Sequence, residues 1–589
     1  MPTITSLRSL IPGASALLLV LCMLFGPACK TPVVTEKNNG KISSKKLTQA
    51  EQLQLTALFI DGTREKSLGN YDKAIGLYAQ CIKRSDTYAP AMYEMAGILD
   101  KRGQYADALV LASSAVKLEP QNEWYQLLLS GIYADMRDYN GAAKTMDQLS
   151  SQFPGKPDYL FNLADIYIMD GKFADAVKVY DEIEKNFGIS EDVSLQKEKL
   201  YLQMNKANKA IEEIEKLVEA FPSEVKYMIM LGDLYLTSGN EFKGLDLYDK
   251  ILKISPNNPY VHLSLADYYK VQNKEEKSFE ELKLAFASPD MEIDSKVRIL
   301  LQYYQLSAAN PGLLEQAYAL CIITTQTHPE EAKAWSIYGD FLNRDNRIKE
   351  AADVFRKVIT LDPNRYAVWE ELLYMDSFLG NNELLLTESA SALELFPEQA
   401  EPYLYNGFAN IRLKNPTLAI KVLKQGLAYA TGDPLLLKFH ANLGEAYYMV
   451  NDYDQSFDHY EKALKIDPEN TFILNNYCYC LAQQKRNLGR AEELAHKLIK
   501  LVPDNPLFED TYAWVLFMQE KYEPAKAMLE QSLAHGGTKN ASILEHYGDV
   551  MFKLKDTVKA LEYWNKAKDA GTASELLLKK INDKTWYEK

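Results

Sequence analysis

The sequence predicts an all-α protein in which about fifteen helix–turn–helix units stack into a solenoid. Two observations lead to this fold class. The chain has 589 residues, which is too many for one hydrophobic core, because single cores stop growing near ~250–300 residues. From about Ala50 onward, bulky and small residues recur with a period of 34. With 47% hydrophobic and 25% charged residues, most of the chain is expected to be folded and soluble.

The clearest unit is Ala332–Arg365, whose residues we number as places 1 to 34. Small residues at places 8 and 20 let two helices approach, and bulky residues at places 4, 7, 11 and 24 fill the space between them. Proline at place 32 ends the second helix, because it lacks an amide donor and would clash. The residues that carry the pattern are Trp335, Tyr338, Gly339, Leu342, Ala351, Phe355, Val358 and Pro363.

The same pattern returns in Ala89–Asn122 and in Leu437–Asn470. It resembles the tetratricopeptide repeat, a helix–turn–helix module, over most of the chain. The resemblance implies a right-handed superhelix in which each unit covers the apolar face of its neighbour. Fifteen units of 34 residues fit within Leu55–Gly571, and Ala573–Tyr587 is expected to form a final helix that caps the stack.

The chain begins with the features of a secretory signal peptide in residues 1–28. A charged start is followed by an apolar run, and small residues then precede Cys29. This ending resembles a bacterial lipobox, although Gly26 stands where that motif usually has leucine. The resemblance implies cleavage before Cys29 and lipidation of this cysteine. Ordinary signal cleavage and an uncleaved anchor are the alternatives, since about 18 apolar residues nearly span a bilayer.

Residues 29–48 have the composition of a flexible tether, because they contain proline, asparagine and serine but no hydrophobic period. Thr48 and Glu51 have the spacing of a capping box and predict the start of the first helix. Beyond the tether, breaks in the repeat divide the chain. We expect an N-terminal repeat array at 49–290, an irregular repeat at 291–331, a middle array at 332–435, a C-terminal array at 436–572 and a capping helix at 573–589.

The sequence carries no catalytic, cofactor-binding or metal-binding signature, and we do not expect an enzyme. None of the seven histidines is three or four residues from another histidine or a cysteine, although residues on different helices could still meet. Cys81, Cys321, Cys478 and Cys480 are expected to be small buried side chains of the repeats. A net charge of −15 argues against nucleic-acid binding, which requires clustered lysine and arginine.

The surface best suited to a ligand is predicted on the first helices of the repeats. The resemblance implies that places 2, 5, 9, 12 and 13 form a concave groove that binds peptides. Place 5 is apolar in five successive units, and several aspartates at place 9 would favour a cationic ligand. Packing between repeats and local hydrogen bonding of the aspartates are the alternatives. The predicted groove residues are Leu127, Phe161, Asp165, Leu195, Ile229, Asp233, Leu263 and Asp267.

Together these features predict a non-enzymatic scaffold that is anchored by lipid in a bacterial envelope and binds envelope proteins or peptides. Lys30, rather than aspartate, follows Cys29 and favours the outer membrane, facing the periplasm. The plan is similar to that of lipoprotein adaptors of C-terminal processing proteases, which implies presentation of substrates to a protease. It is also similar to repeat lipoproteins of outer-membrane assembly, gliding and type IX secretion machineries. A carbohydrate-processing enzyme with a site near Ser288–Pro311 is the less favoured alternative, and the oligomeric state stays unknown.

Overall fold

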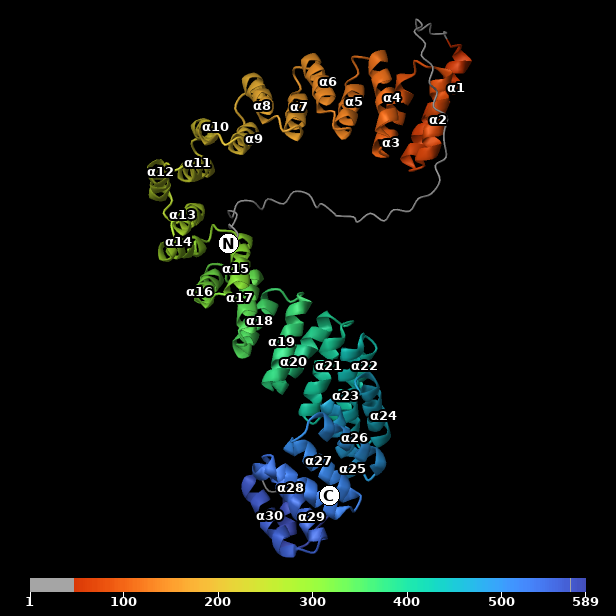
Figure 1. Ribbon diagram of the computed structural model, residues 1–589, viewed down its shortest axis with the longest axis vertical. Helices are drawn as coiled ribbons and strands as arrows, with labels where there is room; N and C mark the ends of the chain where they lie inside the picture. The colour runs from red at the N-terminus through yellow and green to blue at the C-terminus, as the bar shows by residue number, and fades with distance from the viewer. Residues whose placement is uncertain (1–46, 572–573, 589) are drawn as a thin grey trace. The chain divides into compact units, whose positions relative to one another are not determined.

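A computed structural model describes residues 47–571 and 574–588. Every regular element in these residues is helical, with 31 α-helices and one short 3-10 helix, which confirms the predicted all-α fold. Figure 1 shows the helices following one another in pairs along the chain. The signal sequence, Cys29 and nearly all of the tether lie outside the described residues.

The helices divide into two compact units, and the division falls after Glu213, within α10. The first unit contains α1 (Gln49–Ser67), α2 (Tyr71–Arg84), α3 (Ala89–Lys101), α4 (Tyr105–Leu118), α5 (Glu123–Asp135), α6 (Tyr139–Gln152), α7 (Pro157–Met169), α8 (Phe173–Phe187), α9 (Glu191–Gln203) and the start of α10 (Ala207–Ala220).

The second unit contains the rest of α10 and all later helices. Its first half holds α11 (Val225–Thr237), α12 (Glu241–Ile254), α13 (Pro259–Val271), α14 (Glu275–Ala287), α15 (Ile293–Ser307), α16 (Pro311–Thr327), α17 (Ala332–Arg344), α18 (Ile348–Leu361), α19 (Tyr366–Leu379) and α20 (Asn382–Leu395). Its second half holds α21 (Ala400–Arg412), α22 (Pro416–Leu427), α23 (Asp433–Met449), α24 (Tyr453–Ile466), α25 (Thr471–Gln483), α26 (Leu488–Leu501), α27 (Pro506–Met518), α28 (Tyr522–Ala534), η1 (Gly537–Lys539), α29 (Ala541–Lys553), α30 (Thr557–Ala570) and α31 (Glu575–Asp583).

In the described residues, α1 to α30 form fifteen consecutive pairs, and α31 stands alone at the end. The first helix begins where the capping box predicted, since the Thr48 side chain accepts from the Glu51 amide and Glu51 accepts from Thr48 in return. The last helix is capped by the Ser574 side chain and is shorter than the predicted Ala573–Tyr587. It ends at Asp583, and Lys584 follows it in the left-handed conformation.

The turn inside each pair shows the repeat directly in the backbone. In every pair except α15–α16, the described residue at place 15 has a positive φ, the left-handed cap that ends many helices. Glycine or asparagine fills most of these turns, because both tolerate this conformation. The residues are Gly69, Gly103, Arg137, Gly171, Asn205, Gly239, Asn273, Asn346, Gly380, Lys414, Asn451, Lys485, Glu520 and Lys555.

The unit at 291–331, predicted to be irregular, still forms a helix pair. Its helices are longer than most, with 15 residues in α15 and 17 in α16. Place 15 of this unit is Ser307, which lies inside α15 rather than in a turn. The irregularity is therefore an extended first helix that removes the usual left-handed cap.

Within most pairs, the glycine or small residue at place 8 lies under the side chain at place 24. A Cβ added to Gly62 would lie 2.7 Å from the Tyr78 ring, and one added to Gly444 would lie 2.9 Å from the Tyr460 ring. Real Cβ atoms essentially never approach so closely, so the two helices meet where only glycine fits. The same conflict arises at Gly232 with Tyr248, Gly339 with Phe355, and Gly548 with Trp564.

Replacing Gly339 with alanine should therefore destabilise the α17–α18 pair. The added methyl group would force Phe355 or its helix to move, and overpacking of this kind costs about 1–3 kcal/mol. Amide hydrogen exchange in α17 and α18 should become faster. Gly76→Ala is the matched control, because a Cβ on this helical glycine meets nothing within 4 Å and alanine improves helix propensity by about 1 kcal/mol. If Gly339→Ala left amide protection in its own helix pair unchanged from the wild type, as Gly76→Ala should do in α1 and α2, the packing argument would be contradicted.

Candidate functional site

The predicted groove residues of the first unit lie on a strip of partly exposed side chains. We define the N-terminal strip as places 5, 9 and 12 of α5, α7 and α9. Leu127, Phe161 and Leu195, at place 5, are half-buried, and Asp165, at place 9, is exposed. At place 12, Leu202 is 41% exposed. The complete strip is Leu127, Gly131, Ala134, Phe161, Asp165, Ile168, Leu195, Lys199 and Leu202.

The apolar residues of the N-terminal strip have one packed side and one accessible side. Leu127, Phe161 and Ile168 pack against the core cluster that includes Leu163 and Tyr180. Met169, the residue after Ile168 in α7, is 62% exposed. Apolar surface that continues over neighbouring helices is typical of interaction sites. The structure shows that these residues are accessible, and their role in binding stays a prediction.

The predicted groove residues of the second unit are placed differently. Ile229 is only 7% exposed and belongs to a core cluster with Tyr248 and Val261, so it packs the repeats together. Leu263, Asp233 and Asp267 are half-buried. The prediction that Ile229 lines an accessible groove is therefore wrong, because the next helix pair covers this side chain.

The aspartates at place 9 have several environments. Asp233 accepts a hydrogen bond from the Tyr248 hydroxyl, and Asp549 accepts one from Trp564 Nε1 at 2.8 Å. In both pairs the donor stands fifteen residues later, at place 24, so the local hydrogen-bonding interpretation holds for these two. No described donor hydrogen-bonds Asp165, and burial raises the pKa of its carboxyl group. Asp165 is the place-9 aspartate of the first unit that stays available to a ligand.

Sequence analysis missed a pair of carboxyl groups in the first unit. Asp100, at place 12 of α3, lies beside Asp135, at place 13 of α5, and its Oδ1 atom is buried without a hydrogen-bond partner. Burial and the neighbouring Asp135 raise the pKa of Asp100. The two residues are 35 apart in sequence, close to one repeat, and that spacing was the only signal that could have indicated the contact.

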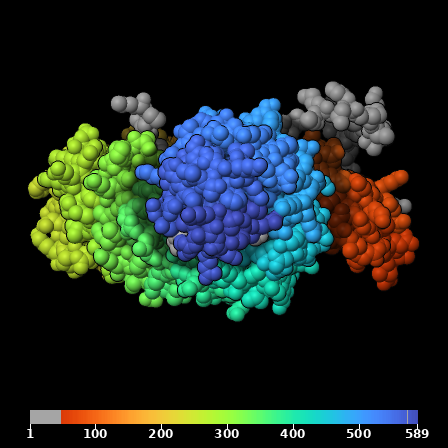
Figure 2. All heavy atoms as spheres, turned by 90° about the horizontal axis from the view of Figure 1, so that it is seen from below, coloured from red at the N-terminus to blue at the C-terminus, as the bar shows by residue number. Residues whose placement is uncertain are grey.

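In the C-terminal repeats, the corresponding surface is covered. Lys580 of α31 lies 2.8 Å from Glu545 and 2.7 Å from Asp549, at places 5 and 9 of α29. Beyond α31, the Trp586 ring packs 5.8 Å from Phe517 of α27. Figure 2 shows the C-terminal residues, in blue, as one packed block. The last repeats therefore offer no open strip like that of the first unit.

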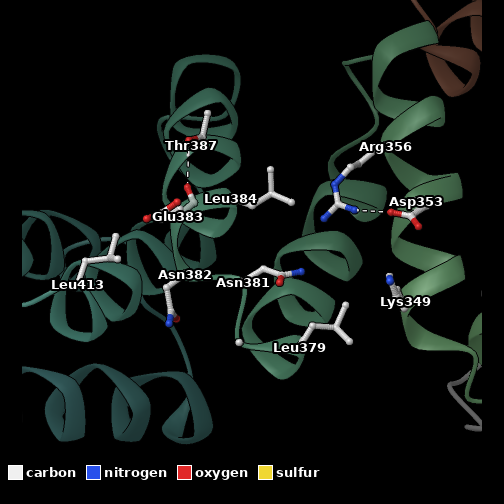
Figure 3. A pocket seen from close by; sticks show the side chains of 11 residues that line it. Lys349, Asp353, Arg356, Leu379, Asn381, Asn382, Glu383, Leu384, Thr387 and Leu413 are labelled. Atoms are coloured by element: carbon white, nitrogen blue, oxygen red, sulfur yellow. Dashed lines mark hydrogen bonds and ion pairs between the residues drawn. The ribbon is translucent and has the colours of Figure 1, made fainter.

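A cavity of about 760 Å³ opens beside α18, α20 and the turn between α19 and α20. Figure 3 shows Arg356 and Lys349 on one side and Asn381 and Asn382 on the other. The guanidinium of Arg356 is already paired, since it contacts Asp353 and two carboxyl groups behind the cavity, those of Asp376 and Glu388. The guanidinium of Arg356 is therefore not available to a small ligand, although Lys349 and Glu383 also line the cavity.

The carboxyl groups of Asp376 and Glu388 lie beside each other, and Arg356 contacts both of them. Asp376 Oδ2 and Glu388 Oε2 are both buried and receive no hydrogen bond from a described donor. Burial and the contact with Asp376 raise the pKa of Glu388, whereas Arg356 opposes the rise. A protonated Glu388 that donates to Asp376 satisfies both oxygens and leaves one negative charge to balance Arg356.

The cysteines and histidines of the described residues behave largely as structural groups. Cys81, Cys321, Cys478 and Cys480 are buried and free, as predicted. Burial raises the pKa of the Cys480 thiol to about 12, so a reactive thiolate is disfavoured. Three further groups, missed in the sequence because they are distant in it, come together: Asp504, Glu509 and His535 have ligand atoms within 4.8 Å of one another. His535 is engaged by Glu509 at 2.8 Å.

The segment near Ser288–Pro311, considered for an enzymatic site, contains one unusual group. The Lys296 amine is fully buried and donates to the Ser288 carbonyl at 3.0 Å and to the Thr327 hydroxyl at 2.8 Å. Burial lowers its pKa to about 8. Since the amine ties a loop to the end of α16 and is closed to solvent, its role is structural.

Stability should depend on pH through Glu388. Its folded pKa is raised, so its contribution to the free energy of unfolding is complete at acid pH and is lost as pH rises through the folded value. Glu388→Gln should keep the neutral donor, flatten this decline, and exceed the wild type at about pH 9 by roughly 1 kcal/mol. Thermal unfolding followed by circular dichroism at several pH values measures the effect. Glu383→Gln, at an exposed position of the same helix, should leave the dependence of the unfolding free energy on pH as in the wild type. If Glu388→Gln showed this same dependence, a protonated Glu388 beside Asp376 would be refuted.

Comparison with known proteins agrees with this architecture. Models of the tetratricopeptide repeat match residues 67–132, 130–188, 199–259, 313–366 and 438–470. Anaphase-promoting complex subunit cut9 of Schizosaccharomyces pombe is 27% identical over 181 residues, which cover 31% of this chain and 26% of cut9. Type IV pilus assembly protein PilF of Pseudomonas aeruginosa is 27% identical over 188 residues, which cover 31% of this chain and 71% of PilF.

Among solved structures, yeast Tom70 aligns over 85% of this chain and 95% of its own, with 17% identity and a TM-score of 0.30. The matches span only about a quarter of the curated relatives cut9 and human tetratricopeptide repeat protein 6, at 26% and 28% of their lengths. None of the described helices combines the length and hydrophobicity that crossing a bilayer requires. The helix pairs, their turns and the matching repeat models together identify the fold as a tetratricopeptide-repeat solenoid.

Proposed function

We propose that the protein is a non-enzymatic scaffold that binds segments of other proteins on its N-terminal strip. The observation that supports this proposal is the strip itself, an apolar surface over three neighbouring helices with Asp165 and Lys199 among its side chains. Its residues are only partly used in packing. Solenoids present such surfaces repeatedly, because each unit adds one helix to the same face.

We further propose that the chain is tethered to a membrane of a bacterial envelope through lipid on Cys29. This part rests on the lipobox-like sequence before Cys29 and on Lys30 after it, which favours the outer membrane, with the repeats in the periplasm. A tether with the composition of residues 29–48 would span roughly 25 Å, so the repeats would work close to the membrane surface.

The mechanism that follows is co-localisation. A scaffold that holds two partners raises their effective concentration toward the millimolar range without any chemistry of its own. An envelope protease and its protein substrate are the partners that the adaptor interpretation implies. The buried Lys296 amine and Cys321 thiol are closed to substrates.

A second candidate is a component of an envelope assembly, gliding or secretion machinery. The similarity to PilF, a type IV pilus assembly protein, favours it, because the match covers 71% of PilF. The two candidates share the N-terminal strip and the tether and differ in the partner.

Changing Met169 and Leu202 together to aspartate should weaken partner capture. Leu202 belongs to the N-terminal strip, and Met169 borders it next to Ile168. Both side chains are exposed, Met169 at 62% and Leu202 at 41%, so the charges should disrupt the apolar surface without unfolding the repeats. In-cell crosslinking of the full-length protein, followed by mass spectrometry, should show recovery of specific partners reduced about tenfold, which corresponds to a loss of about 1.4 kcal/mol. Circular dichroism should be unchanged.

Val110→Asp is the matched control, because Val110 is 66% exposed on a second helix of the same unit. It should capture partners like the wild type. Cys29→Ser should release the protein from the membrane fraction. Undiminished capture by the double variant would exclude the N-terminal strip as the binding surface. A protease or peptidoglycan hydrolase among the partners supports the adaptor, and assembly or secretion components support the machinery candidate.

A further inference from the structure

The first helices α3 and α5 carry glycine at place 9, where nothing in the packing requires it. A Cβ on Gly131 would meet no atom within 4 Å, and one on Gly97 would reach only Leu128, at 4.0 Å. This differs from place 8, where the aromatic ring of place 24 excludes a side chain. Glycine in a helix costs about 1 kcal/mol relative to alanine. The space above these two glycines is therefore open, and the helix backbone is accessible there.

The side chains around Gly131 fall in one row on α5. Leu127 and Asp135 lie four residues before and after Gly131, so all three face the same way. Trp124, one further turn back, is 62% exposed. This face of α5 therefore presents, in order, the Trp124 indole, the Leu127 side chain, the accessible backbone at Gly131 and the Asp135 carboxylate.

The carboxyl pair of Asp100 and Asp135 closes one end of this surface. Asp100 Oδ1 is buried and has no partner among the described donors. Two basic side chains of the first two repeats have other partners, since Lys66 pairs with Glu94 and Arg102 pairs with Asp72. Lys101 lowers the pKa of Asp100 less than burial and Asp135 raise it. Two other carboxylates of the first unit, those of Glu184 and Glu213, pair with the buried Lys197 amine. The Asp100–Asp135 pair lacks such a cation.

We infer that this surface, the Gly131 site, receives a segment of a partner protein that carries a lysine or arginine side chain next to an apolar one. We define the site as Gly97, Asp100, Trp124, Leu127, Gly131 and Asp135. The cation would lie between the two carboxyl groups and supply the missing donor, and the apolar side chain would cover Trp124 and Leu127. The inference rests on the proposed scaffold function and adds the location and chemistry of the ligand.

The test uses the full-length protein in detergent and an array of short synthetic peptides matched in length and hydropathy. In one set all charged residues are lysine or arginine, in a second all are aspartate or glutamate, and a third has none. The basic set should bind at least tenfold more tightly than the acidic set. This preference should weaken as salt rises, because exposed charges are screened.

Two variants locate the binding. Gly131→Tyr fills the open space without a clash and should reduce binding of the basic set about tenfold. Gly76→Tyr, on the outer helix α2, is the matched control, since a Cβ there also meets nothing within 4 Å, and it should bind like the wild type. Asp100→Asn with Asp135→Asn should remove the preference for basic over uncharged peptides while circular dichroism stays unchanged.

Equal binding of acidic and basic peptides, or wild-type affinity in Gly131→Tyr, would overturn the inference. Failure here is distinguishable from failure of the scaffold proposal. Crosslinking in cells could capture partners in a way that depends on Met169 and Leu202 while the array shows no charge preference. That result would support the scaffold proposal and exclude the Gly131 site. If crosslinking captures nothing and Gly131→Tyr does not affect the array, both fail.

Discussion

The close approach of two helices at place 8 of most repeats is the constraint on which the rest of the structure depends. At Gly62, Gly232 or Gly444, the backbone of the first helix touches the aromatic ring of place 24, and no Cβ could be accommodated. This contact fixes the rotation of the first helix about its axis. Because a helix turns 100° per residue, fixing place 8 against the second helix also fixes where places 5, 9 and 12 point. In the N-terminal strip, the small residues Ser130 and Ala164 stand at place 8 of α5 and α7, so helix packing inside these two pairs sets the direction of their strip residues.

Buried charges distinguish one repeat from another within this common frame. Lys197 is enclosed by Asp181, Glu184 and Glu213, and Lys580 is enclosed by Glu545 and Asp549. Such ions are stable only when fully paired, since a single buried charge costs several kcal/mol. The carboxyl pair of Asp100 and Asp135 differs from these sites, because Asp100 Oδ1 is buried and has no hydrogen-bond donor among the described residues. A surface that departs from the pattern of its own fold is where an external cation would be most favourable.

The aspartates at place 9 show how far local sequence can predict a side chain's role. Where a tyrosine or tryptophan stands fifteen residues later, a hydrogen bond can form inside the repeat, as for Asp233 and Asp549. Asp165 also has a tyrosine at that distance, Tyr180, yet no hydrogen bond joins them, and the ring packs against Phe161 instead. A spacing rule therefore indicates which contacts are possible, whereas the rotamers chosen by neighbouring repeats decide which ones form.

The sequence alone determined the helix pairs, the capping box at Thr48, the burial of the cysteines and the weak unit at 291–331, because each follows from spacing within one repeat. The left-handed turns at place 15 could also have been predicted, since glycine and asparagine recur there every 34 residues. Only the tertiary structure decided that Ile229 is buried while Leu202 is exposed, that Asp100 meets Asp135, and that the predicted capping helix binds Glu545 and Asp549 through Lys580. These features depend on how one repeat is set against the next. The orientation of each repeat against the next results from many small contacts between units, and the 34-residue period of the sequence does not specify it.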